Sequence, residues 1–140
     1  MRFMVVNERL VIFVNLASAP SDSEWSAYVD AVRSRRRKQP GVRILAITEG
    51  GAPTAKQRQA AATVAKDLPC AVISDSVVAR TIVTALSWLG VNVKSFSASG
   101  TDRAFDFLEL SSAERTSATT AIAAMRLELV ISRERLRNKR

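Results

Sequence analysis

The sequence contains no histidine and, in Cys70, a single cysteine among 140 residues. Without histidine the chain cannot build a histidine-based catalytic triad or a histidine metal site, and one thiolate cannot hold a zinc ion by itself. The glycine-rich signatures of a P-loop and of a dinucleotide-binding turn are also missing. We therefore expect a protein that is not an enzyme and that carries no metal or cofactor.

One cysteine also excludes a disulfide framework within the chain, and no apolar run approaches the ~20 residues of a membrane-spanning helix. Residues 10–17 are apolar, and the segment Ala17-Ser18-Ala19-Pro20 resembles a signal-peptide cleavage site. However, Asn15 interrupts this short run, and cleavage there would remove two segments with strand patterns. We therefore expect a cytoplasmic protein with no transmembrane segment.

The net charge of +8 lies in two short segments. Residues 33–38 carry five basic groups, and residues 126–140 carry six basic and two acidic groups. Clustered basic side chains can contact phosphates without reading a base sequence, although no aromatic platform or recognition-helix motif accompanies them. They indicate either solvated helix ends or a surface for nucleic acid or another anionic partner. The principal basic residues are Arg33, Arg35, Arg36, Arg37, Lys38, Arg133, Arg135 and Arg137.

Strand and helix patterns alternate along the chain. Capping boxes at Ser21/Glu24, Thr54/Gln57 and Ser111/Glu114 mark three helix starts. We expect an α/β fold with a mixed sheet, in which an antiparallel hairpin comes first and the later strands are parallel. The expected order of elements is β-β-α-β-α-β-α-β, followed by a helix. Residues 1–110 form this domain, and 111–140 form an extra long C-terminal helix with a basic tail. The predicted strands are 2–6, 9–14, 42–47, 70–73 and 91–96, and the helices are 22–38, 55–68, 77–89, 101–108 and 112–136.

The predicted helix 77–89 is apolar on two faces, whereas a helix that covers only its own sheet needs one. We expect one stripe, Val78, Ile82, Ala85 and Leu89, to face the sheet. The other face is either covered by the C-terminal helix or forms an interface with another chain. That second face consists of Val77, Thr81, Thr84 and Trp88, with Arg80 beside it.

Polar residues follow the predicted parallel strands at their carboxyl ends, where α/β sheets commonly bind ligands. Free N–H groups of the following helices could hold an anion there, but glycine, serine and threonine also serve in plain turns and caps. Both interpretations stay open. The candidate ligand residues are Gly50, Gly51, Thr54, Ser74, Asp75 and Ser76, with Ser99 nearby. Cys70, at the start of a buried strand, is expected to be a core residue and not a reactive thiol.

The segments 48–58 (TEGGAPTAKQR), 71–76 (AVISDS) and 83–88 (VTALSW) resemble bacterial STAS/SEC14-type domain proteins, which are relatives of the anti-sigma factor antagonists. The resemblance covers residues 1–110 and implies a STAS-like mixed sheet and a role in binding partner proteins. The antagonists carry a phosphorylatable serine in an Asp-x-Ser-Gly loop before their second helix. Here that loop lacks the motif, and Thr54 is the nearest hydroxyl.

Taken together, we expect a non-enzymatic interaction or regulatory module that binds a protein partner or forms a homo-oligomer. Binding of nucleic acid or an anionic surface, and small-ligand binding at the strand ends, are the alternatives. The expected interface comprises Val77, Arg80, Thr81, Thr84 and Trp88, together with Ile122, Met125 and Leu129 of the C-terminal helix.

Overall fold

The computed structural model describes all 140 residues as five strands and five α-helices. The predicted α/β class and its five-stranded mixed sheet are confirmed. A 3₁₀ turn at Ala98–Gly100, which was not expected from the sequence, precedes α4. The elements are β1 (Arg2–Val6), β2 (Leu10–Asn15), α1 (Asp22–Lys38), β3 (Arg43–Thr48), α2 (Ala55–Ala65), β4 (Pro69–Ile73), α3 (Val77–Trp88), β5 (Asn92–Phe96), α4 (Thr101–Phe107) and α5 (Ser112–Asn138).

The strands lie in the sheet in chain order, β1-β2-β3-β4-β5. β1 pairs antiparallel with β2 through a tight hairpin in which Asn7 and Glu8 both have positive φ. The other three pairs are parallel. Central strands of such a sheet are covered on both sides, and accordingly β2, β3 and β4 are buried along almost their whole length.

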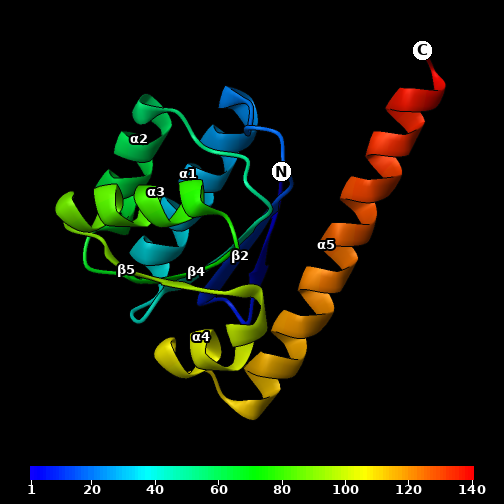
Figure 1. Ribbon diagram of the computed structural model, residues 1–140. Coiled ribbons are helices and arrows are strands. Elements are labelled where there is room, and N and C mark those ends of the chain that lie inside the picture. Colours follow the sequence, from blue (N-terminus) through cyan, green and yellow to red (C-terminus); the bar gives the residue numbers. More distant parts are fainter.

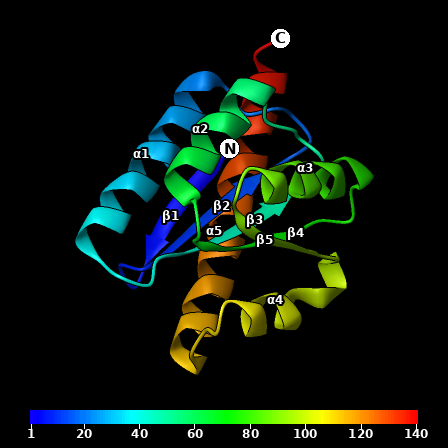
Figure 2. The same cartoon turned by 90° about the vertical axis from the view of Figure 1, so that its left-hand side faces the viewer.

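Two helical layers enclose the sheet (Figures 1 and 2). α1, α2 and α3 cover one face, because three successive right-handed crossovers that step in one direction place their helices on the same side. α4 and α5 cover the other face, where α5 packs on β1 and β2 and α4 packs on β4 and β5. The two cores therefore consist of alternate side chains of the same strands: Leu45 faces the α5 side and Ala46 the α1–α3 side.

Local side-chain bonds define where the helices begin. All three predicted capping boxes are present, at Ser21/Glu24, Thr54/Gln57 and Ser111/Glu114. In each, the cap hydroxyl accepts from the backbone N–H three residues on, and the acidic or amide side chain accepts from the N–H of the cap residue. Two otherwise unpaired donors are thus satisfied at each helix start.

α5 is the longest element, and at ~1.5 Å per residue its 27 residues extend about 40 Å. Its first half packs against the sheet through Ala118, Ala121 and Met125. The Arg43 side chain of β3 binds the Glu114 carboxylate and the Leu108 carbonyl, which fastens the start of α5 to the sheet. The last turns of the helix extend beyond the rest of the molecule (Figure 1), and every residue from 133 onward is exposed.

Candidate functional site

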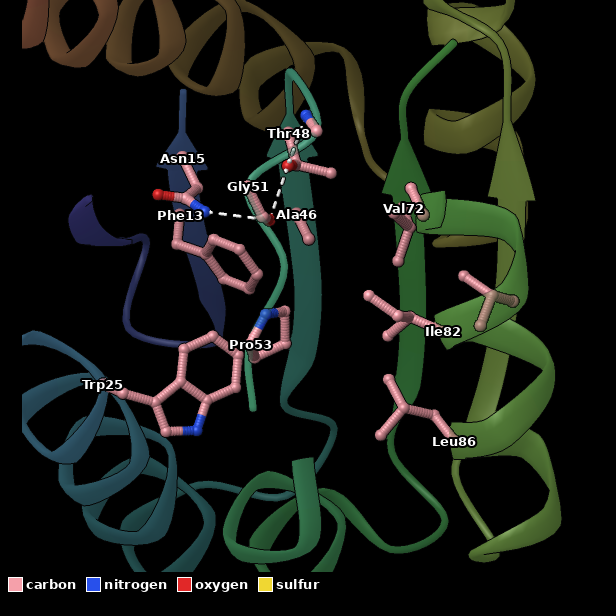
Figure 3. A pocket seen from close by; sticks show the side chains of 13 residues that line it. Phe13, Asn15, Trp25, Ala46, Thr48, Gly51, Pro53, Val72, Ile82 and Leu86 are labelled. Atoms are coloured by element: carbon pink, nitrogen blue, oxygen red, sulfur yellow. Dashed lines mark hydrogen bonds between the residues drawn. The ribbon is translucent and has the colours of Figure 1, made fainter. Parts of the chain in front are cut away.

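An apolar chamber lies between α3 and the other two helices of its layer. α1 packs against α2, whereas α3 packs chiefly on β5, so the layer is incomplete above β3 and β4. The resulting chamber has a volume of about 60 Å³. Figure 3 shows Trp25, Phe13 and Pro53 on one side of it and Ile82 and Leu86 on the other. Its floor is formed by Ala46 and Val72 of the two central strands.

A second chamber of about 50 Å³ continues from the first. The two share six lining residues, among them Trp25, Ala46 and Leu86, so they adjoin each other. The second chamber extends under α2, where Ala61 and Ala65 line it. Small side chains on α2 and β3 therefore leave the space that larger ones would fill.

Trp25 is held rigidly in the chamber wall. Its indole Nε1 donates a 2.7 Å hydrogen bond to the carbonyl of Gln57, and Phe13 and Tyr28 pack edge-on against its ring. The Gln57 side chain in turn donates to the Pro20 carbonyl and the Asp22 carboxylate. α1 and the start of α2 are thus tied together, which fixes one side of the chamber.

Tyr28 and Cys70 are buried titratable groups in the lining of the second chamber. Burial raises the pKa of the Cys70 thiol to about 12, so the thiol is neutral at physiological pH. Burial, with a smaller contribution from Cys70, raises the pKa of Tyr28 well above its usual value of 10. Both groups are therefore uncharged, and Cys70 is a buried residue, as predicted.

The loop before α2 forms the rim of the first chamber, which places the predicted residues Gly50 and Gly51 there. The Gly51 carbonyl accepts from the Asn15 amide and the Thr48 hydroxyl. A Cβ on Gly51 would lie 2.2 Å from the Ser18 carbonyl oxygen, so only glycine fits. Thr54 is committed to its capping box and lines neither chamber.

The other predicted ligand residues surround a separate, wide hollow of about 440 Å³ at the carboxyl ends of β3 and β4. Each of them already has a structural hydrogen bond. Ser74 Oγ accepts from the Ser76 N–H, Asp75 accepts from the Ala98 N–H, and Ser76 caps α3. Ser99 does not line this hollow, and its hydroxyl bonds to that of Ser97.

No local sequence pattern indicates that Arg126 of α5 reaches this hollow. Arg126 and Glu49 both line it and form no ion pair. A second hollow of about 480 Å³ adjoins it between α4 and α5, and the two share the apolar residues Ile47, Ile73 and Ala98. A residue that enters a site from a distant helix has no local sequence signal.

The outer face of α3 is exposed to solvent. Trp88 is 83% exposed and Val77 is 70% exposed. The alternative that the C-terminal helix covers this face is wrong, because α5 lies on the opposite face of the sheet. Arg80, Thr81 and Thr84 are exposed on the same side as Trp88.

The prediction of which α3 residues face the sheet is also wrong. Val78 is 53% exposed and Leu89 is 41% exposed, whereas Ala79 and Val83 are buried. The helix is turned by about one residue relative to the expected stripe, because its packing on β5 and the rest of the sheet decides which side is buried. The outer face therefore carries more apolar surface than the sequence pattern predicted.

The three residues of α5 that were assigned to the interface pack on the protein's own sheet. Met125 is 2% exposed, and Ile122 and Leu129 pack against the same core cluster. α5 exposes other apolar side chains, including Leu127 and Leu136.

The two basic segments lie at the ends of α1 and α5. Arg33 pairs with Asp30, and Arg36 donates to the carbonyls of Val64 and Lys66 at the end of α2, so part of the first segment has a structural role. The other residues of that segment, Arg35, Arg37 and Lys38, complement the dipole of the last turn of α1. On α5, Arg133, Arg135 and Arg137 are exposed and form no ion pair.

No protein-family model matches the chain, and no curated protein or solved structure is significantly similar to it. None of the helices is both long and apolar enough to cross a bilayer. No group of three or more cysteine, aspartate or glutamate side chains is placed to hold a metal ion. The resemblance to STAS/SEC14-type proteins stays a prediction.

Proposed function

We propose that the protein is a non-enzymatic, cytoplasmic, STAS-like interaction module that self-associates through the outer face of α3. The observation that carries this proposal is the 83% exposure of Trp88 on that face. An exposed tryptophan on a face that also exposes Val77 is typical of an interaction surface, because burying its ring on a partner stabilises the complex.

The arrangement of the face favours a second copy of the chain as the partner. α3 contains no acidic residue, and its single charge is Arg80. Arg80 lies four residues before Thr84, and Trp88 lies four residues after it. In an antiparallel pair of α3 helices related by a two-fold axis at Thr84, each Arg80 would therefore lie over the Trp88 ring of the other copy. Cation–π contacts of this kind stabilise interfaces, and the small Thr84 side chain allows the helices to approach.

Light scattering coupled to size-exclusion chromatography over a concentration series tests this proposal. We expect a dimer at tens of micromolar and a dissociation constant at least tenfold higher for Trp88→Ala, since a central tryptophan contributes about 2 kcal/mol or more. Leu136→Ala is the matched control, because Leu136 is 67% exposed but lies on α5. A wild-type monomer at these concentrations, or loss of the dimer in Leu136→Ala alone, contradicts the proposal.

Binding of nucleic acid through the end of α5 is a second candidate function. The observation that favours it is the set of exposed arginines at 133, 135 and 137 with no acidic partner. Filter binding of single- and double-stranded DNA and of RNA at increasing salt should show affinity that falls steeply, and replacing the three arginines with glutamine should reduce that slope. Absence of binding at low salt rejects this candidate.

A further inference from the structure

The two joined chambers under α1, α2 and α3 have an almost entirely apolar lining. No charged side chain lines the first chamber. Arg58 is the one charged residue at the second chamber, and its guanidinium donates a 2.9 Å hydrogen bond to the Pro53 carbonyl. The space is thus apolar and is separate from the exposed α3 surface proposed above for self-association.

The chambers are larger than ordinary packing defects. Protein interiors are close-packed, and a void needs only about 10–15 Å³ to admit a water molecule. The chambers measure about 60 and 50 Å³ and adjoin each other. Apolar cavities on this scale stay dry, and an engineered cavity of about 150 Å³ binds benzene or xenon. The two chambers together are smaller than that cavity, so the space suits a molecule no larger than a single aromatic ring.

Tyr28 adds one polar group to the second chamber. Its side chain is 4% exposed, yet none of the protein's side-chain hydrogen bonds involves its hydroxyl. No completely sealed polar side-chain atom in the protein lacks a partner. The Tyr28 hydroxyl is therefore not completely sealed, and Tyr28 and Cys70 both line the second chamber.

We propose that the joined chambers are a binding site for a compact, uncharged ligand of the phenol class: a single apolar ring with one hydrogen-bonding substituent. The ring would lie over Ala46 and Val72, between Trp25 and Leu86. Its substituent would bond to the Tyr28 hydroxyl. A carboxylate on the ring would be excluded, because the chamber offers no free cation to replace the lost hydration.

Trp25 provides a direct reporter, because the chain has only two tryptophans. In Trp88→Phe protein the single indole N–H resonance in a ¹H–¹⁵N spectrum belongs to Trp25, and the tryptophan of the self-association surface no longer contributes a signal. We expect phenol and benzene to shift this resonance saturably and benzoate to leave it unchanged. Tyr28→Phe should weaken phenol binding about three- to tenfold and leave benzene binding unchanged, as expected for one lost hydrogen bond.

Filling the chamber tests its location. Ala46→Leu, on the floor of both chambers, should weaken phenol and benzene binding at least tenfold, whereas the same change at the exposed Ala60 of α2 should not. Ala61→Leu fills the second chamber and replaces Ala46→Leu should that variant fail to fold. Equal binding in the filled and control variants overturns the proposal. So does the absence of a saturable shift with either ring compound up to its solubility limit.

Discussion

The Asn15 side chain donates a 3.1 Å hydrogen bond to the Gly51 carbonyl, and a Cβ on Gly51 would lie 2.6 Å from the same Asn15 nitrogen. Asn15 ends β2, and Gly51 lies in the loop between β3 and α2. This contact draws the loop onto the sheet and thereby forms the rim of the apolar chamber. The absence of a side chain at residue 51 is consequently a structural requirement.

We therefore predict that Gly51→Ala lowers the free energy of unfolding by about 1–3 kcal/mol, because the new methyl group forces the loop away from the end of β2. Urea denaturation measures this change. Gly100→Ala is the matched control, since its Cβ would have its nearest neighbour at 3.5 Å, an ordinary contact. That variant should stay within about 0.5 kcal/mol of wild type. Equal effects of the two substitutions would contradict the steric account.

Met125 and Leu127 test which side of α5 holds it to the sheet. Met125 is 2% exposed in the core, and Leu127, two residues on, is 60% exposed. Met125→Ala should destabilise the protein by about 2–5 kcal/mol through lost burial and the cavity left behind. Leu127→Ala should change stability by no more than about 0.5 kcal/mol. Chemical denaturation of the two variants measures both changes. A larger loss of stability in Leu127→Ala than in Met125→Ala would show that the other side of α5 faces the sheet.

Glu114 makes stability sensitive to acid. Partial burial by itself would raise the pKa of Glu114, but the Ser111 N–H and the Arg43 guanidinium outweigh it and lower the pKa below 4.5. A carboxyl whose pKa is lower in the folded state stabilises the fold above its unfolded pKa. That contribution is lost as the pH falls through the folded value.

Glu114→Gln should therefore reduce stability at pH 7 and show a smaller further loss between pH 5 and pH 3 than wild type. Glu134→Gln is the control, because Glu134 is exposed near the end of α5 and forms no ion pair. Thermal unfolding across this pH range provides the comparison. A wild-type acid profile in Glu114→Gln would show that the Arg43 contact contributes nothing.

Cys70 should be unreactive in the folded protein. With its pKa raised to about 12, the thiol supplies almost no nucleophilic thiolate at pH 8. Alkylation by iodoacetamide, followed by mass spectrometry, should be at least a hundredfold slower in native protein than in protein unfolded by guanidinium. Similar rates in the two states would show that the chamber opens readily to the reagent.

Features that depend on neighbouring residues were predictable from the sequence. The capping boxes at Ser21, Thr54 and Ser111 each need only four consecutive residues, and all three are present. The buried strands follow from apolar runs, and the order of strands and helices leads to a mixed parallel sheet. The rim glycines Gly50 and Gly51 were predicted as candidate residues for a small ligand or an anion at the strand ends, and not for an apolar chamber.

Tertiary structure alone decided which faces meet. The sequence shows that α3 has more apolar surface than one sheet contact needs, but it does not show how the helix is rotated. It also does not show that the chain after β5 crosses to the other side of the sheet and leaves Trp88 uncovered. The chamber likewise arises where Trp25, Ala46 and Leu86, from three separate elements, fail to fill a common space. Local sequence determines each element, whereas the gaps and exposed faces between elements depend on how all of them pack together.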